Sequence, residues 1–197
     1  MNESRNGVIT IVSGLPRCGT SMMMKMLEAG GIETVVDNIR KSDEDNPRGY
    51  YEFEKVKKID KDASWLGETR GKVFKMVSML LYHLPAEHRY KIIFMKRRME
   101  EMLASQKKML ERKGIQPKQT DDQITRLYED HLKDIEKWLQ SRDHIEVLYV
   151  NYNEVLNDPV SNARRVHAFL GDPLEEDEMI RAIDPSLYRQ RKPAPAS

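Results

Sequence analysis

A glycine-bounded loop between an apolar segment and a helical segment constrains the fold of this chain more than any other feature. Residues 7–13 form a β-branched run that is typical of a buried parallel strand. Gly14 follows this run, Gly19 stands five positions later, and residues 20–29 have a helical composition that ends at a pair of glycines. This order predicts an α/β nucleotide-binding fold with an anion site in the loop, although ordinary strand-to-helix turns are also rich in glycine.

The rest of the chain alternates between strand and helix patterns. Further strands are expected at 72–77, 90–95 and 145–150, and helices at 54–63, 100–112, 120–140, 159–170 and 175–183. Thr120 and Gln123 have the spacing of an N-terminal capping box. Pro159 and Gly171 stand where a helix would begin and end. The alternation favours one mostly parallel sheet that is covered on both faces.

The fold class that follows is α/β. We predict a single domain over residues 1–197, with a mostly parallel central sheet flanked by helices. A helical insertion is expected at 112–141 and a basic C-terminal tail at 184–197. The methionines of the first helix are expected to fill the core or a permissive apolar acceptor pocket; they are Met22, Met23, Met24 and Met26.

Composition narrows the function classes. The chain has 33 basic and 32 acidic residues, a net charge of +1, so no global field attracts nucleic acid. No apolar run has the length of a membrane span, and the N-terminus lacks the pattern of a signal peptide. The single cysteine, Cys18, excludes an internal disulfide and favours a cytoplasmic location. No cysteine–histidine cluster has metal-ligand spacing.

The charge of the loop separates it from that of an ATP-hydrolysing enzyme. A Walker loop has lysine before its Ser or Thr, but Thr20 occupies that position here and the positive charge lies at Arg17. No acidic residue ends a later strand to hold Mg²⁺, because the third strand is followed by Arg97 and Arg98. The loop is therefore expected to bind a phosphate-like group without a metal.

The loop sequence resembles the 5′-phosphosulfate loop of the sulfotransferase family. That loop reads Pro, Lys or Arg, Ser, Gly, Thr, then Thr or Ser, and the matching residues are Pro16, Arg17, Cys18, Gly19, Thr20 and Ser21. The arginine version is similar to the loops of tyrosylprotein sulfotransferases and many bacterial sulfotransferases. Cys18 replaces the usual serine and removes a hydroxyl donor. The resemblance implies a P-loop NTPase-like sulfotransferase fold and the donor 3′-phosphoadenosine 5′-phosphosulfate (PAPS).

A second motif matches the part of the family that holds the 3′-phosphate of the donor. Sulfotransferases carry an arginine, an acidic residue at plus four and a serine at plus eight, and this chain has Arg97, Glu101 and Ser105. The resemblance implies that Arg97 and Ser105 bind the 3′-phosphate. The usual Asn-Pro after the arginine is replaced by Arg98-Met99.

Two later segments agree with the family in order. Residues 152–156 with Pro159, and then 169–171, resemble a Tyr-Glu-Asp-Leu … Pro … Phe-Leu-Gly stretch that is expected to pack under the nucleotide site. The family often closes the 3′-phosphate site with a late basic loop, for which Arg189 and Arg191 are the candidates, although a solvated basic tail is an equally good interpretation.

The proposed chemistry is an in-line displacement that depends on positioning and charge. A guanidinium does not give up its proton readily, so Arg17 is expected to stabilise the leaving oxygen by charge and hydrogen bonding. Cytosolic sulfotransferases have a Lys-Thr-His motif at the end of the second strand. This chain has Lys75-Met76-Val77, so the histidine is missing. Lys75 is a candidate to contact the sulfuryl oxygens, although an ordinary surface lysine near a strand end is the slightly favoured interpretation.

With that histidine missing, a carboxylate is expected to act as the base for the acceptor. Glu52 is the first candidate because it follows a Pro-Gly turn and two aromatic residues, and Asp37 is the second. Other acids in the same region are Asp43, Glu44 and Asp45. Each of these side chains could equally be an ordinary solvated acid.

The acceptor is not evident, and two other functions stay open. A small molecule or peptide could bind between residues 37–63 and the insertion, whose helix at 120–140 could alternatively pack against a second copy in a homodimer. One alternative function is a P-loop kinase of nucleotides or small molecules. The other is a nucleotide-binding protein that shares the fold but catalyses no transfer.

Overall fold

Four parallel strands form the centre of the fold. The computed structural model describes residues 7–37, 51–117, 119–171 and 173–184. The strands are β1 (Val8–Gly14), β2 (Val73–Val77), β3 (Arg89–Lys96) and β4 (Ile145–Asn151), in the order β2-β1-β3-β4. Each lies within one residue of its expected limits. The predicted α/β class with a parallel sheet is confirmed.

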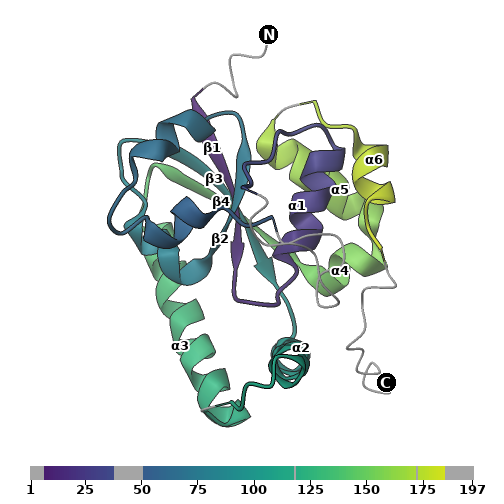
Figure 1. The fold of residues 1–197 in the computed structure, drawn as a ribbon. Helices are drawn as coiled ribbons and strands as arrows, with labels where there is room; N and C mark the ends of the chain where they lie inside the picture. Colours follow the sequence, from purple (N-terminus) through teal and green to yellow (C-terminus); the bar gives the residue numbers. More distant parts are fainter. Residues whose placement is uncertain (1–6, 38–50, 118, 172, 185–197) are drawn as a thin grey trace.

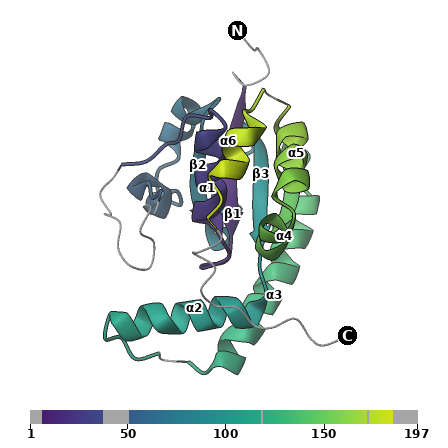
Figure 2. The same ribbon diagram turned by 90° about the vertical axis from the view of Figure 1, so that its right-hand side faces the viewer.

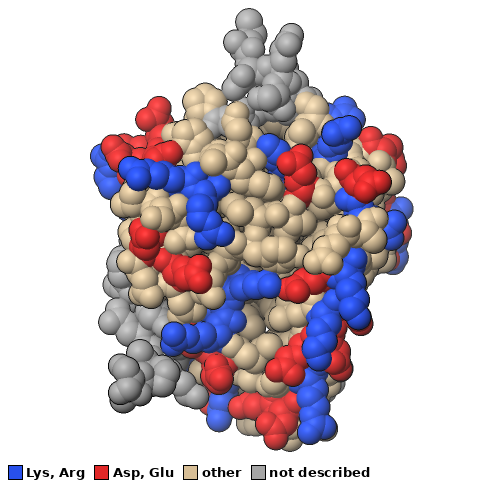
Figure 3. All heavy atoms as spheres, turned by 180° about the vertical axis from the view of Figure 1, so that it is seen from behind, with Lys and Arg blue, Asp and Glu red and all other residues tan. Residues whose placement is uncertain are grey.

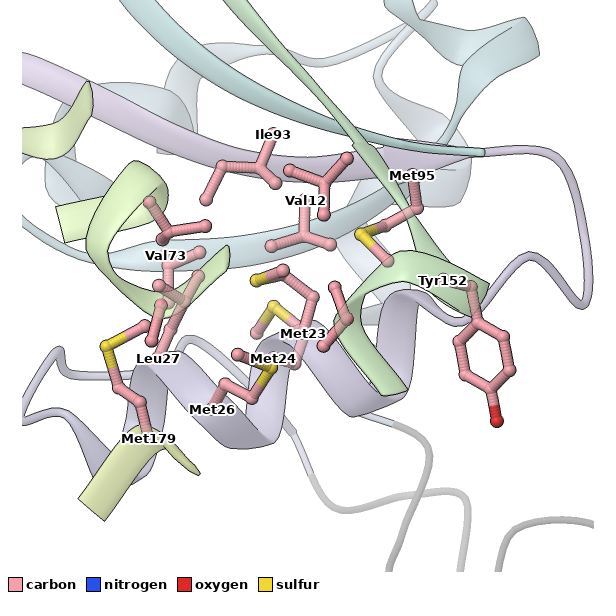
Figure 4. Packing of buried hydrophobic residues seen from close by; sticks show 14 of the residues in the cluster. Val12, Met23, Met24, Met26, Leu27, Val73, Ile93, Met95, Tyr152 and Met179 are labelled. Atoms are coloured by element: carbon pink, nitrogen blue, oxygen red, sulfur yellow. The ribbon is translucent and has the colours of Figure 1, made fainter. Parts of the chain in front are cut away.

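One face of the sheet is covered by α1 (Thr20–Ala29), α4 (Tyr152–Asn157), α5 (Pro159–Leu170) and α6 (Glu176–Arg181) (Figures 1 and 2). Figure 4 shows the packing beneath these helices, where methionines of α1 contact the sheet. Met23, Met24 and Met26 have no exposed surface. Flexible thioether side chains fill irregular gaps between elements, so these three residues are core, as one of the two interpretations predicted.

The opposite face is covered by α3 (Asp121–Gln140) and three short 3₁₀ helices: η1 (Glu54–Lys58), η2 (Ser64–Thr69) and η3 (Ser78–His83). The single helix expected over 54–63 is wrong. Asp62 ends that segment, because its side chain accepts a hydrogen bond from the Ser64 backbone N–H at 3.0 Å and starts η2. Trp65 then packs edge-on against Phe74 of β2, with ring centroids 5.2 Å apart.

The predicted helix ends near α3 and α5 are found. Thr120 and Gln123 form a reciprocal capping box at the start of α3. Pro159 begins α5, and Gly171 ends it with a φ of 72°, which a glycine adopts without steric cost.

The carboxyl ends of the strands lie beside the remaining helix pair. Figures 1 and 2 show α2 (Met99–Arg112) lying across that end of the sheet, with α3 running back along it. The loop after β1 turns at the same end before α1 begins. Loops and helix N-termini at the carboxyl ends of parallel strands are the usual location of ligand sites in such folds.

Charges of both signs are interspersed on the surface. The face in Figure 3 shows lysines and arginines alternating with acidic residues, with no patch of a single sign dominating it. Among the described residues, none of the helices combines the length and apolarity that crossing a bilayer requires.

Candidate nucleotide-binding and active site

The loop from Gly14 to Ser21 has a backbone that depends on its glycines. Gly14 lies opposite Val77 of β2 and Met95 of β3, and its φ is 145°. A Cβ atom on Gly14 would lie 2.6 Å from both the Met95 carbonyl oxygen and the Cys18 Sγ atom. The close approach of strand and loop is therefore possible only without a side chain at this position.

Gly19 is restricted in the same way by α4. Its φ is 102°, and an added Cβ atom would lie 2.4 Å from Cδ2 of Tyr152. The ring of Tyr152 thus packs directly against the loop at the start of α1. This contact places the Tyr152 segment under the loop, where the sequence predicted it.

The start of α1 directs the positive end of its helix dipole toward the loop. Met22 and Met23 donate their backbone N–H groups to the Gly19 carbonyl, which begins the helix. The first turn of α1 contains no acidic residue, so the positive end of the helix dipole is not neutralised there. Thr20 and Ser21 are both partly exposed at this end.

The two predicted nucleotide motifs lie in direct contact. Arg17 donates its Nε–H to the Ser105 Oγ atom at 2.9 Å, and Arg97 donates an Nη1–H to the Arg17 carbonyl at 3.3 Å. Arg97 also stacks over the Tyr152 ring, 4.3 Å from its centroid. Residues about 80 positions apart in the sequence therefore form one basic site at the carboxyl end of the sheet.

A buried carboxylate orients Arg97. Glu101 is 2% exposed and accepts from Arg97 Nε at 3.0 Å. Asn153 of α4 donates its side-chain N–H groups to both Glu101 oxygens at 3.1 Å, which satisfies a charge that would otherwise be costly to bury. Asn153 belongs to the segment expected to pack under the nucleotide site, but the sequence did not reveal its bond to Glu101, because that contact spans 52 residues.

Cys18 is a packing residue in this loop. It is 1% exposed, and burial raises the pKa of its thiol to about 12. Backbone hydrogen bonds and the positive charges of Arg97 and Lys75 oppose this effect without cancelling it. The side chain that replaces the family's serine is thus a protonated, apolar filler at neutral pH.

Lys75 lies on the strand beside the loop. It pairs with Val12 in the ladder between β2 and β1, and its charge is close enough to act on the Cys18 thiol. Val77 takes the place at which the resemblance would put a histidine, and it lies opposite Gly14. The positive charge of Lys75 therefore lies near the loop, and its contact with the sulfuryl oxygens stays a prediction.

Asp37 and Glu52 come together at the outer edge of β2. Thr34 pairs with Val73, and the chain then runs alongside β2 to Asp37, whose N–H donates to the Glu52 carbonyl at 3.2 Å. The Asp37 carboxylate accepts from the Glu54 backbone N–H at 2.5 Å. Glu52, whose side chain is 18% exposed, lies 3.5 Å from the Lys57 ammonium. Five other candidates lie outside the described residues: Asp43, Glu44, Asp45, Arg189 and Arg191.

A polar pair that the sequence did not single out lies just beyond β2. The Ser78 Oγ atom and the His131 Nε2 atom are 2.8 Å apart, which joins the start of η3 to α3. The sequence could not identify this pair, because a histidine in a helix has no local signal of its tertiary partner.

Comparison with known proteins agrees with this geometry. Residues 9–197 match the family model described as a sulfotransferase domain, so the chain belongs to the sulfotransferase family. No curated protein sequence matches it significantly.

Two solved structures share the fold. Mouse sulfotransferase SULT7A1 complexed with PAP gives a TM-score of 0.57 at 18% identity, covering 94% of this chain and 64% of the mouse chain. The sulfotransferase domain of the Synechococcus PCC 7002 olefin synthase gives 0.51 at 14% identity, covering 96% of this chain and 90% of that domain. This chain therefore spans less than two thirds of the mouse protein, and the likeness is one of fold.

The Gly19 contact can be tested with a matched pair of variants. Gly19→Ala and Gly31→Ala both place a side chain at a φ near +100°, but nothing lies within 4 Å of the Gly31 position. We expect Gly19→Ala to cost about 1–3 kcal/mol more in urea unfolding, because Tyr152 must move. It should also weaken the binding of 3′-phosphoadenosine 5′-phosphate (PAP), measured by calorimetry, whereas Gly31→Ala should not. Equal effects of the two variants would contradict the packing of Tyr152 against the loop.

The burial of Cys18 predicts its reactivity. Because burial disfavours the thiolate, the native protein should resist iodoacetamide at pH 8 and react readily in denaturing urea, as followed by mass spectrometry. Because the pKa is raised to about 12, the thiolate remains a very small fraction at both pH 7 and pH 9, so native labelling should stay much slower than labelling in urea at either pH. Rapid labelling of the native protein would show that the loop is open in solution.

Proposed function

We propose that the chain is a PAPS-dependent sulfotransferase that transfers a sulfuryl group to a hydroxyl or amine acceptor by metal-independent in-line displacement. The observation that carries this proposal is the direct contact between the two predicted anion sites. Arg17 of the loop bonds Ser105, and Arg97 bonds the Arg17 backbone. A donor that carries anionic groups at the 3′ and 5′ positions of one ribose matches two basic motifs that adjoin at the carboxyl end of the sheet.

Each site suits one part of the donor. The loop residues Pro16 to Ser21 and the N-terminus of α1 would bind the 5′-phosphosulfate through backbone N–H groups. Arg97, held by Glu101, and Ser105 would bind the 3′-phosphate, for which a planar guanidinium and a hydroxyl are suitable donors. We keep Arg189 and Arg191 as further candidates for that phosphate.

The chain's own residues supply charge at the reacting end. Negative charge develops on the oxygen that bridges sulfur and the 5′-phosphate as its bond to sulfur breaks. We propose that the guanidinium of Arg17 stabilises this charge and that the ammonium of Lys75 contacts the sulfuryl oxygens. Neither group needs to transfer a proton for this role.

The acceptor must lose a proton, and the expected carboxylates both have other contacts. The carboxylate of Asp37 holds the first residue of η1, which supports a structural role. Glu52 remains the first candidate of the two, yet its side chain lies in an ion pair with Lys57. Each carboxylate therefore has a partner in residues 54–57 that a base would have to give up.

Three further proposals concern the cellular location, the acceptor and the oligomeric state. We propose a cytoplasmic enzyme, in keeping with its single, buried and protonated cysteine. We propose a small-molecule or peptide acceptor, without a role for nucleic acid. A homodimer remains a proposal that the exposed residues of α3 allow, including Leu127.

The 3′-phosphate assignment predicts the effect of Arg97→Lys. Lysine keeps a positive charge beside Glu101 but loses the planar fork, so we expect PAP to bind about tenfold more weakly in calorimetry. Adenosine 5′-phosphate, which lacks the 3′-phosphate, should bind both proteins equally. Arg98→Lys, at the neighbouring side chain that is 47% exposed, is the control and should bind PAP like the wild type. An equal loss for both nucleotides would place the 3′-phosphate elsewhere.

A further inference from the structure

The polar pair of Ser78 and His131 lies at the same end of the sheet as the loop. Val77 is opposite Gly14 in the ladder, and Ser78 is the next residue. Neighbouring strands are about 4.8 Å apart, so Ser78 begins η3 within a few ångströms of the start of the loop. Its side chain has no exposed surface, while His131 is partly exposed. The imidazole is thus held at the donor end of the sheet by a buried hydroxyl.

The position of His131 is fixed by the helix that carries it. One turn later, Ile135 is fully buried against the sheet, and Glu136 accepts a hydrogen bond from Lys96 at the end of β3 at 2.5 Å. α3 is therefore attached near the ends of both β2 and β3, on either side of β1. This arrangement holds the imidazole at a defined place instead of on a free surface helix.

Exposed apolar side chains lie close in sequence to Ser78. The described part of the chain exposes six large hydrophobic residues, and three of them, Val77, Met79 and Tyr82, lie between the last residue of β2 and the end of η3. The Tyr82 ring lies edge-on to His131, with centroids 6.1 Å apart. An exposed apolar group of this kind next to a basic anion site suits an apolar ligand whose reacting atom faces the anion.

One tautomer of His131 satisfies both contacts of the Ser78 hydroxyl. In that tautomer the hydroxyl donates to the Met79 Sδ atom at 3.7 Å and accepts from His131 Nε2–H at 2.8 Å. The other ring nitrogen, Nδ1, then carries a lone pair. Burial lowers the pKa of His131 below its ordinary value of about 6.5, although Asp134 acts in the opposite direction. The titratable groups near it are Asp134 and Glu136 on α3, Tyr82 on η3 and Lys96 on β3.

We propose that His131 is the base that takes the proton of the acceptor, and that the acceptor is an apolar alcohol or phenol bound on Val77, Met79 and Tyr82. The acceptor oxygen forms a bond to sulfur, and the bond from sulfur to the bridging oxygen breaks, leaving its electron pair on the 5′-phosphate of PAP. The acceptor proton moves to Nδ1 of His131 and then to solvent. This inference rests on the proposed function, and it assigns the role of base to His131 instead of Asp37 or Glu52.

The test uses a variant that keeps the anchor but cannot take the proton. His131→Gln retains a polar group for Ser78, and 2-naphthol with PAPS is the probe. We expect kcat to fall at least about 100-fold with an unchanged KM for PAPS. In the wild type, kcat should rise with pH through the titration of His131, because only the neutral ring accepts a proton. His131→Gln should lose this dependence. His83→Gln, at the exposed end of η3, is the matched control and should behave like the wild type.

The outcomes separate the base, the acceptor and the donor. If His131→Gln keeps the wild-type kcat and pH dependence while Glu52→Gln loses most of its kcat, then His131 is not the base and the Ser78–His131 pair is only a structural contact. Absence of 2-naphthol sulfation, together with unchanged NMR signals of Met79 and Tyr82 when 2-naphthol is added to the PAP complex, would overturn the apolar acceptor. Failure of PAP itself to bind would instead refute the proposed function.

Discussion

The guanidinium of Arg97 joins four segments of the chain at the carboxyl end of the sheet. It bonds the backbone of the loop at Arg17, is held by the buried Glu101 of α2, and stacks on Tyr152 of α4. Tyr152 in turn contacts Gly19, so the loop is supported from below and from the side. Removing the charge of Arg97 would leave Glu101 buried without its cation, which is why the structure of the loop and its affinity for anions depend on one another.

The proposed acceptor side differs in character from the proposed donor side. The proposed donor site consists of charges and backbone groups that are fixed by buried contacts, whereas the end of β2 and η3 present Val77, Met79 and Tyr82 to solvent. In the proposed function, this pairing of a fixed anion site with an apolar surface would let one donor serve acceptors that differ in shape. The two parts meet at the ladder position of Gly14 and Val77.

Local patterns predicted the fold well, and they singled out the loop and the Arg97 motif that the structure brings into contact. The strands, the loop and the caps at Thr120 and Gly171 each depend on residues close in sequence, so their signals are contained in short windows. The helix expected over 54–63 failed because Asp62 starts a new turn. The bond from Asn153 to Glu101 and the Ser78–His131 pair could not be found, because each depends on a contact across more than 50 residues that only the packed helices create.

The proposed site recognises a nucleotide by its 3′-phosphate and without a metal. This recognition can be measured by calorimetry of the wild-type protein with PAP and with ATP, each with and without Mg²⁺. We expect PAP to bind equally well with and without Mg²⁺ and at least about tenfold more tightly than ATP under either condition. Tighter binding of ATP that requires Mg²⁺ would rule out recognition through the 3′-phosphate and favour a kinase.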